Sequence, residues 1–67
     1  MAAVTDPHDV YFEITIMGDS AKVAAIDGAS GTEVLVLGPA HAAERELKRL
    51  AVAKLRARLA REANEAT

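Results

Sequence analysis

Residues 21–37 read AKVAAIDGASGTEVLVL, two apolar runs joined by the turn-forming segment 27–31. β-branched and small apolar residues bounded by glycine and aspartate are typical of a β-hairpin. Gly31 can adopt the left-handed conformation that a four-residue loop needs near its end. Asp27 can accept hydrogen bonds from loop amides, and Thr32 can cap the far side. The implied register places Ala25 opposite Val34 and also pairs Val23 with Val36, Ile26 with Glu33, Ala24 with Leu35 and Lys22 with Leu37.

A second hairpin is predicted immediately upstream. Residues 10–17, VYFEITIM, alternate between two sides, as a half-buried strand does. The segment ends at Gly18-Asp19, and a glycine at the first central position favours a type II′ turn. With this turn, residues 10–17 add a third strand to the hairpin and complete an antiparallel sheet. The predicted pairs are Ile16 with Ala21, Ile14 with Val23, Phe12 with Ala25, Thr15 with Lys22 and Glu13 with Ala24.

Downstream, Gly38-Pro39 is expected to stop the third strand, because proline cannot donate to a ladder. Residues 42 to about 64 are rich in alanine, leucine, arginine, lysine and glutamate, which are strong helix formers. His41 is expected at the N-cap with Glu44 three residues later, a capping box whose serine or threonine is replaced. The helix is expected to face the sheet with these residues: Ala43, Leu47, Leu50, Ala51, Leu55, Leu59 and, at the margin, Val52.

The predicted fold is therefore α+β: a three-stranded antiparallel meander followed by one C-terminal α-helix packed on one sheet face. Residues 10–64 are predicted to form this single domain. Residues 1–9 lack periodicity and are expected to form a flexible N-terminal tail, and residues 65–67 a frayed C-terminus.

The sheet has too much apolar surface for one helix to cover. One predicted face carries Phe12, Ile14, Ile16, Val23, Val34 and Val36, with Ala21 and Ala25. The other face is predicted to be an interaction face, and its apolar members are Tyr11, Met17, Ile26, Leu35 and Leu37. Contiguous exposed apolar surface usually marks an interaction site. We expect a homodimer through this face or through an open edge strand; alternatively, the helix crosses obliquely and the patch stays exposed.

Length and composition support a partner subunit. A chain of 67 residues has a small core, and such chains often add disulfides, a metal or a partner. The chain has no cysteine, which closes the disulfide and thiolate routes. The N-terminus lacks the basic and apolar regions of a signal peptide, and no segment has the length of a membrane span. We expect a cytoplasmic protein without membrane association.

Charge is distributed unevenly along the chain. Residues 1–38 carry six acidic side chains and one lysine, a net charge of −5, whereas residues 39–67 carry seven basic and four acidic side chains, a net charge of +3. Arg45, Arg49 and Arg56 project away from the leucine stripe and are the candidate polyanion contacts. With an aromatic content of 3%, base stacking is nearly excluded, so we favour a solvated basic face over nucleic-acid binding. An acidic protein, including the acidic half of a second copy, is the other alternative.

Enzymatic activity is not expected. The glycine-rich loop 28–31 lacks the Gly-x-x-x-x-Gly-Lys and Gly-x-Ser-x-Gly patterns and leads into a strand, so we interpret it as a turn. His8 and His41 are isolated, and His41 as a general base would need a nucleophile or a pocket that the sequence does not indicate. We therefore assign no catalytic, cofactor-binding or metal-binding residue.

The segments FEI at 12–14, KVAAID at 22–27, GTEV at 31–34 and Gly38-Pro39 with the leucine helix resemble a family of short uncharacterised bacterial proteins that carry a domain of unknown function. The resemblance covers roughly residues 10–60. It implies a β-β-β-α fold and no particular activity. Members of that family tend to have serine at the position of His41, which implies a capping rather than a catalytic role there.

Overall fold

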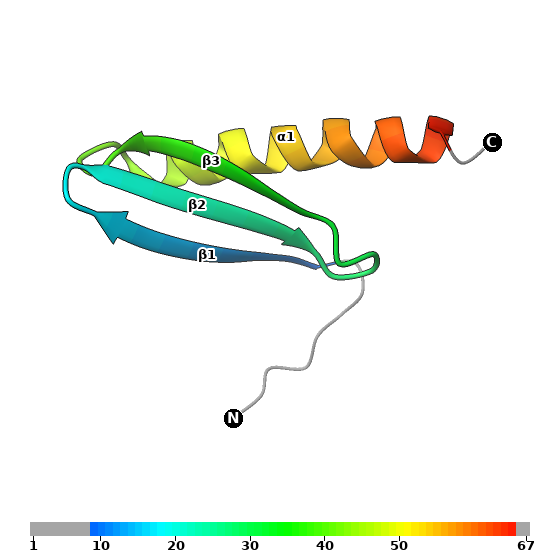
Figure 1. The fold of residues 1–67 in the computed structure, drawn as a ribbon, viewed down its shortest axis with the longest axis horizontal. Helices are drawn as coiled ribbons and strands as arrows, with labels where there is room; N and C mark the ends of the chain where they lie inside the picture. Colours follow the sequence, from blue (N-terminus) through cyan, green and yellow to red (C-terminus); the bar gives the residue numbers. More distant parts are fainter. Residues whose placement is uncertain (1–8, 66–67) are drawn as a thin grey trace, which may run out of the picture.

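The computed structural model describes residues 9–65, which form three strands and one helix (Figure 1). The strands are β1 (Val10–Met17), β2 (Ser20–Asp27) and β3 (Glu33–Pro39), and the helix is α1 (Glu44–Glu65). The sheet is antiparallel in the order β1-β2-β3, with α1 packed on one face. The predicted β-β-β-α fold is thus confirmed. The expected tail at 1–8, including His8, and residues 66–67 of the expected frayed end lie outside the described residues.

Both predicted registers are confirmed. In the first hairpin Ile14 pairs with Val23 and Thr15 with Lys22, and in the second Ala25 pairs with Val34. Gly18 has a φ of 59°, and no non-glycine residue among those described has a positive φ. This combination fits a type II′ turn, in which only the first central residue has positive φ. Because side chains alternate along a strand, the two turns decide which residues face the helix.

The β2–β3 loop is held by its own side chains, as the sequence predicts. The backbone N–H and the Oγ–H of Ser30 donate to Oδ2 of Asp27 at 2.9 and 2.7 Å. Gly31 has a φ of 77°, and its N–H donates to the carbonyl of Asp27 at 2.8 Å. Thr32 Oγ1 also donates to Glu62 Oε1 at 3.1 Å, a contact that joins the loop to the last turns of α1.

The third strand stops at Gly38-Pro39 as expected, although β3 still includes both residues. Gly38 pairs with Ala21 and Pro39 with Ser20. The N–H of Ala40 donates to the carbonyl of Asp19 at 2.7 Å. Because ladder hydrogen bonds alternate along an antiparallel strand, the backbone groups of Pro39 point away from β2, and its missing N–H costs no ladder hydrogen bond. A Cβ atom at Gly38 would lie 2.6 Å from Cδ2 of Leu47, so glycine here lets α1 approach the sheet closely.

The helix starts two residues later than expected, and His41 is not its N-cap. Ala43 precedes the first helical residue, and its carbonyl accepts from the N–H groups of Glu46 and Leu47 at 3.0 and 3.2 Å. Ala42 instead donates its N–H to the carbonyl of Pro39, which places 39–42 in a turn before the helix. Alanine offers no side-chain acceptor to the first helical amides.

The core lies between α1 and the strands β2 and β3. Leu47, Ala51 and Leu55 are buried in one cluster with Val23 and Val34, together with Ala21 and Ala25 of β2. Val52 and Leu59 are half-buried, whereas Ala43 and Leu50 are exposed, which corrects the expectation that they face the sheet. Leu50 shares a row of the helix with Lys54 (i, i+4), and Lys54 reaches the outer edge of β3. Leu50 therefore lies beyond the sheet rather than over it.

Candidate interaction surface

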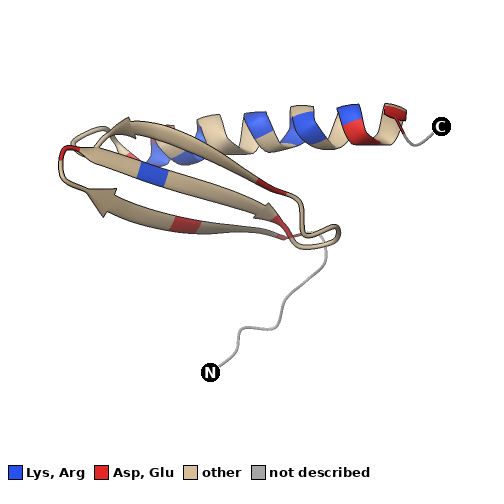
Figure 2. Ribbon diagram, in the orientation of Figure 1, with Lys and Arg blue, Asp and Glu red and all other residues tan. Residues whose placement is uncertain are grey.

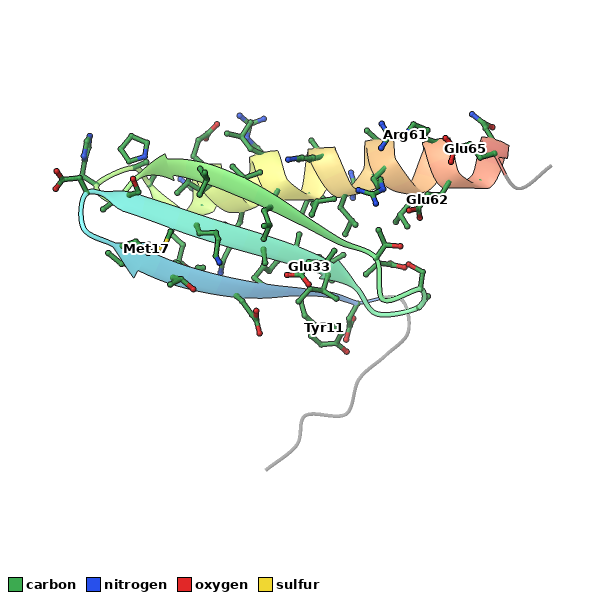
Figure 3. The ribbon with its side chains drawn as sticks, in the orientation of Figure 1. Tyr11, Met17, Glu33, Arg61, Glu62 and Glu65 are labelled. Atoms are coloured by element: carbon green, nitrogen blue, oxygen red, sulfur yellow. The ribbon has the colours of Figure 1, made fainter. Side chains whose placement is uncertain are left out.

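The five residues of the predicted interaction face lie on the face of the sheet opposite α1. The observed register puts Tyr11 opposite Ile26 on that face, and Leu35 and Leu37 lie opposite Ala24 and Lys22. Met17, Leu35 and Leu37 are exposed, Leu37 by 68%. Tyr11 and Ile26 are half-buried. Figure 3 shows Tyr11 and Met17 towards opposite ends of β1.

Tyr11 offers only part of its side chain to this surface. Its hydroxyl oxygen is buried and has no hydrogen-bond partner within residues 9–65. A buried hydroxyl without a partner costs free energy, and replacing it by hydrogen can be neutral or stabilising. The aromatic ring, rather than the hydroxyl, is therefore what Tyr11 offers to this surface.

A second exposed apolar set lies on the helix side of β1 and was missed from the sequence. Ile14 is 39% and Ile16 59% exposed, although Val23 and Ala21, directly opposite on β2, are buried. Figure 1 shows β1 at the side of the sheet farthest from α1. A helix is about 10 Å wide and strands lie about 4.8 Å apart, so one helix covers about two strands. The sequence did hold a sign of this exposure, because it predicts three strands and only one helix to cover them.

The two edges of the sheet differ. On β3, Lys54 donates from Nζ to the carbonyl of Leu35 at 2.6 Å. A lysine at an edge is a common way to stop further strand pairing. On β1, no strand within residues 9–65 pairs with the outer edge. The open edge thus belongs to the strand that also carries Ile14, Ile16 and Met17.

The candidate polyanion contacts Arg45, Arg49 and Arg56 are exposed, and Figure 2 shows basic residues recurring along α1. Arg49 forms an ion pair with Glu46, which lowers the pKa of that carboxyl first through the hydrogen bond and then through the charge of Arg49. Two further bases are paired along the helix, Lys48 with Glu44 and Arg58 with Glu62, both at 3.0 Å. Lys48 also lies 5.3 Å from the ring centroid of Phe12 and covers it. Pairing of this kind is typical of a solvated helix, and nucleic-acid binding stays a prediction.

One hollow lies between α1 and β3. Its volume is about 130 Å³, and it is lined by Val34, Lys54, Ala57, Arg58 and Arg61. Pockets for small organic ligands are usually about 300–1,000 Å³. Lys54 and Arg58 are already bonded to Leu35 and Glu62. The hollow is therefore a weaker candidate for a functional site than the surface of β1.

Within residues 9–65, no three His, Asp or Glu side chains lie close enough together to hold a metal ion. His41 is exposed in the turn before α1. No helix in the same range is long and apolar enough to cross a membrane.

Comparison with known proteins gives one match. A family described as a domain of unknown function (DUF6898) matches residues 7–62, which include all three strands and most of α1. No curated protein and no solved structure matches the chain.

Proposed function

The chain belongs to the DUF6898 family, and because that description assigns no activity, we propose from its surface that it is a non-enzymatic, self-associating interaction module that acts as a homodimer. The observation that carries this proposal is the excess of exposed apolar side chains over a small core. The large exposed hydrophobic residues among those described are Ile14, Ile16, Met17, Leu35, Leu37 and Leu50.

The core that these residues surround is thin. Of the eight buried hydrophobic residues within 9–65, four are alanines: Ala21, Ala24, Ala25 and Ala51. Alanine contributes little apolar area, so the monomer gains little from burial. A second subunit that covers β1 would add the burial that the isolated chain lacks.

The energies make this association feasible. Full burial of a Val, Leu, Ile or Met side chain contributes about 1.5–3 kcal/mol. Ile14, Ile16 and Met17 are each about half exposed, so covering them on both subunits contributes roughly 4–9 kcal/mol. The cost of association is about 4–15 kcal/mol. The two ranges overlap, so burial at β1 together with backbone hydrogen bonds can support a dimer.

Sedimentation equilibrium over a range of concentrations tests the proposal. A homodimer gives twice the 7.1 kDa mass of one chain and a melting temperature that rises with protein concentration. A single-chain mass at every concentration, with a melting temperature that does not change, would refute self-association.

A further inference from the structure

We propose that β1 of one chain pairs antiparallel with β1 of a second copy, so that two three-stranded sheets become one continuous six-stranded sheet. The inference rests on the proposed self-association and specifies its geometry. The proposed interface is the outer edge of β1 and not the open sheet face opposite α1.

The backbone groups at the outer edge of β1 are identified by the alternation of the ladder. Met17 and Ser20 flank a two-residue turn and form a hydrogen-bonded pair, so odd-numbered residues of β1 bond to β2. The same parity is seen at Asp9, whose carbonyl accepts from the N–H of Gly28 just beyond β2. The N–H and C=O groups of four even-numbered residues therefore point outward: Val10, Phe12, Ile14 and Ile16.

The outer edge of β3 does not offer an equivalent row. Its outward residues are odd-numbered, which agrees with the bond from Lys54 to the carbonyl of Leu35. That lysine occupies one acceptor, and Pro39 lacks a donor on the same edge. Since β2 is paired on both sides, β1 is the strand within residues 9–65 that can accept another strand.

β1 is self-complementary in one register. A two-fold axis normal to the sheet relates two antiparallel β1 strands and keeps both helices on the same side. Residues directly opposite each other share a sheet face, so even-numbered residues of one β1 lie opposite even-numbered residues of the other. With Ile14 opposite Ile14 of the second copy, Phe12 faces Ile16. On the open face, Glu13 then faces Thr15 and Tyr11 faces Met17. No like charges are opposed in this arrangement.

The neighbouring registers are poorer. A shift of two residues in one direction places Glu13 opposite Glu13 of the second copy, and like charges directly opposite are destabilising. A shift in the other direction places Phe12 opposite Gly18, which lies in the turn and has a positive φ. The register centred on Ile14 also places the partly exposed Ile14 and Ile16 beside apolar residues of the other copy.

Cysteine cross-linking tests this register directly, because the chain has no cysteine of its own. The variants Glu13→Cys and Thr15→Cys are unfolded, mixed, refolded together in reducing buffer and then oxidised. Positions 13 and 15 form a non-hydrogen-bonded pair with Cα atoms about 4.5 Å apart, which lies within the range for a disulfide. We expect a disulfide-linked dimer between the two variants and almost none from either variant oxidised alone.

Other outcomes separate the hypotheses. Cross-linking of Glu13→Cys alone or of Thr15→Cys alone would overturn the register. A dimeric mass without any of these cross-links would overturn the β1 interface but leave self-association intact. A monomeric mass for the wild-type chain would refute the proposed function itself.

A matched pair of lysine variants provides a second readout. Ile14→Lys places two like charges at the proposed axis, whereas Leu37→Lys places a charge on the open face at β3. Both positions are exposed, so both variants should fold, which circular dichroism checks. We expect Ile14→Lys to sediment as a monomer and Leu37→Lys as a dimer; the reverse result would assign the interface to the open face.

Discussion

Ala43 occupies the N-cap of α1 without a side chain that can accept a hydrogen bond. Ala43→Asp should raise the free energy of unfolding by about 0.5–2 kcal/mol, because aspartate accepts from the first helical amides and its charge suits the helix dipole. Urea denaturation of the variant and the wild type measures the difference.

His41→Asp is the control for this change. The new carboxylate would lie in the turn before the helix rather than at the N-cap, so we expect a smaller gain. A larger gain from His41→Asp than from Ala43→Asp would show that the helix begins at Ala42, as the sequence alone suggested.

Glu46 reports on the exposed face of α1. Because the hydrogen bond and charge of Arg49 lower its pKa, Arg49→Gln should shift the NMR titration midpoint of the Glu46 carboxyl upward. Arg45→Gln removes a neighbouring charge that makes no hydrogen bond to Glu46 and should shift it less. Equal shifts in the two variants would contradict a specific pair.

The sign of the linked pH dependence follows from the direction of this shift. A carboxyl whose pKa is lowered on folding contributes stability that is present above its unfolded pKa. The contribution is lost as the pH falls through the lowered, folded pKa. The stability difference between wild type and Arg49→Gln should therefore shrink as the solution becomes more acidic, and it should remain small because the pair is exposed.

At the scale of elements, Gly38 sets how closely α1 approaches β3. Because a Cβ at Gly38 would lie 2.6 Å from Leu47 Cδ2, Gly38→Ala should lower the free energy of unfolding by about 1–3 kcal/mol through overpacking. Leu47→Ala should cost about 2–5 kcal/mol through a cavity. The double variant should lose less than the two single variants combined, since it removes the clash.

Chemical denaturation of the four proteins completes this cycle. Additive losses would mean that Gly38 and Leu47 do not touch. Such a result would place the first turns of α1 farther from the sheet than the structure does.

The sequence predicts the sheet better than it predicts the position of the helix. Turn length and side-chain alternation together fix the parity of each strand, so every pair from Phe12–Ala25 to Lys22–Leu37 could be derived. A helical wheel identifies a face but not which strands lie beneath it. For that reason Leu50 was wrongly expected in the core and the exposure of Ile14 and Ile16 was not anticipated.

Contacts between residues distant in sequence were also beyond prediction. Lys54 with Leu35 and Thr32 with Glu62 join residues 19 and 30 positions apart. Neither residue type nor spacing indicates such a contact before the helix is placed. The residues of the open sheet face could be derived from the alternation of side chains along each strand. The difference between the outer edges of β1 and β3, in contrast, depends on the contact made by Lys54.

At the scale of the whole molecule, the central claim is that this chain works as a dimer. Its described core consists of alanine, valine and leucine side chains between one helix and two of the three strands, and β1 is unpaired along its outer edge within residues 9–65. Sedimentation equilibrium of the full chain tests the claim most directly. We expect a mass of twice 7.1 kDa that dissociates on dilution; a mass of 7.1 kDa at every concentration would contradict it.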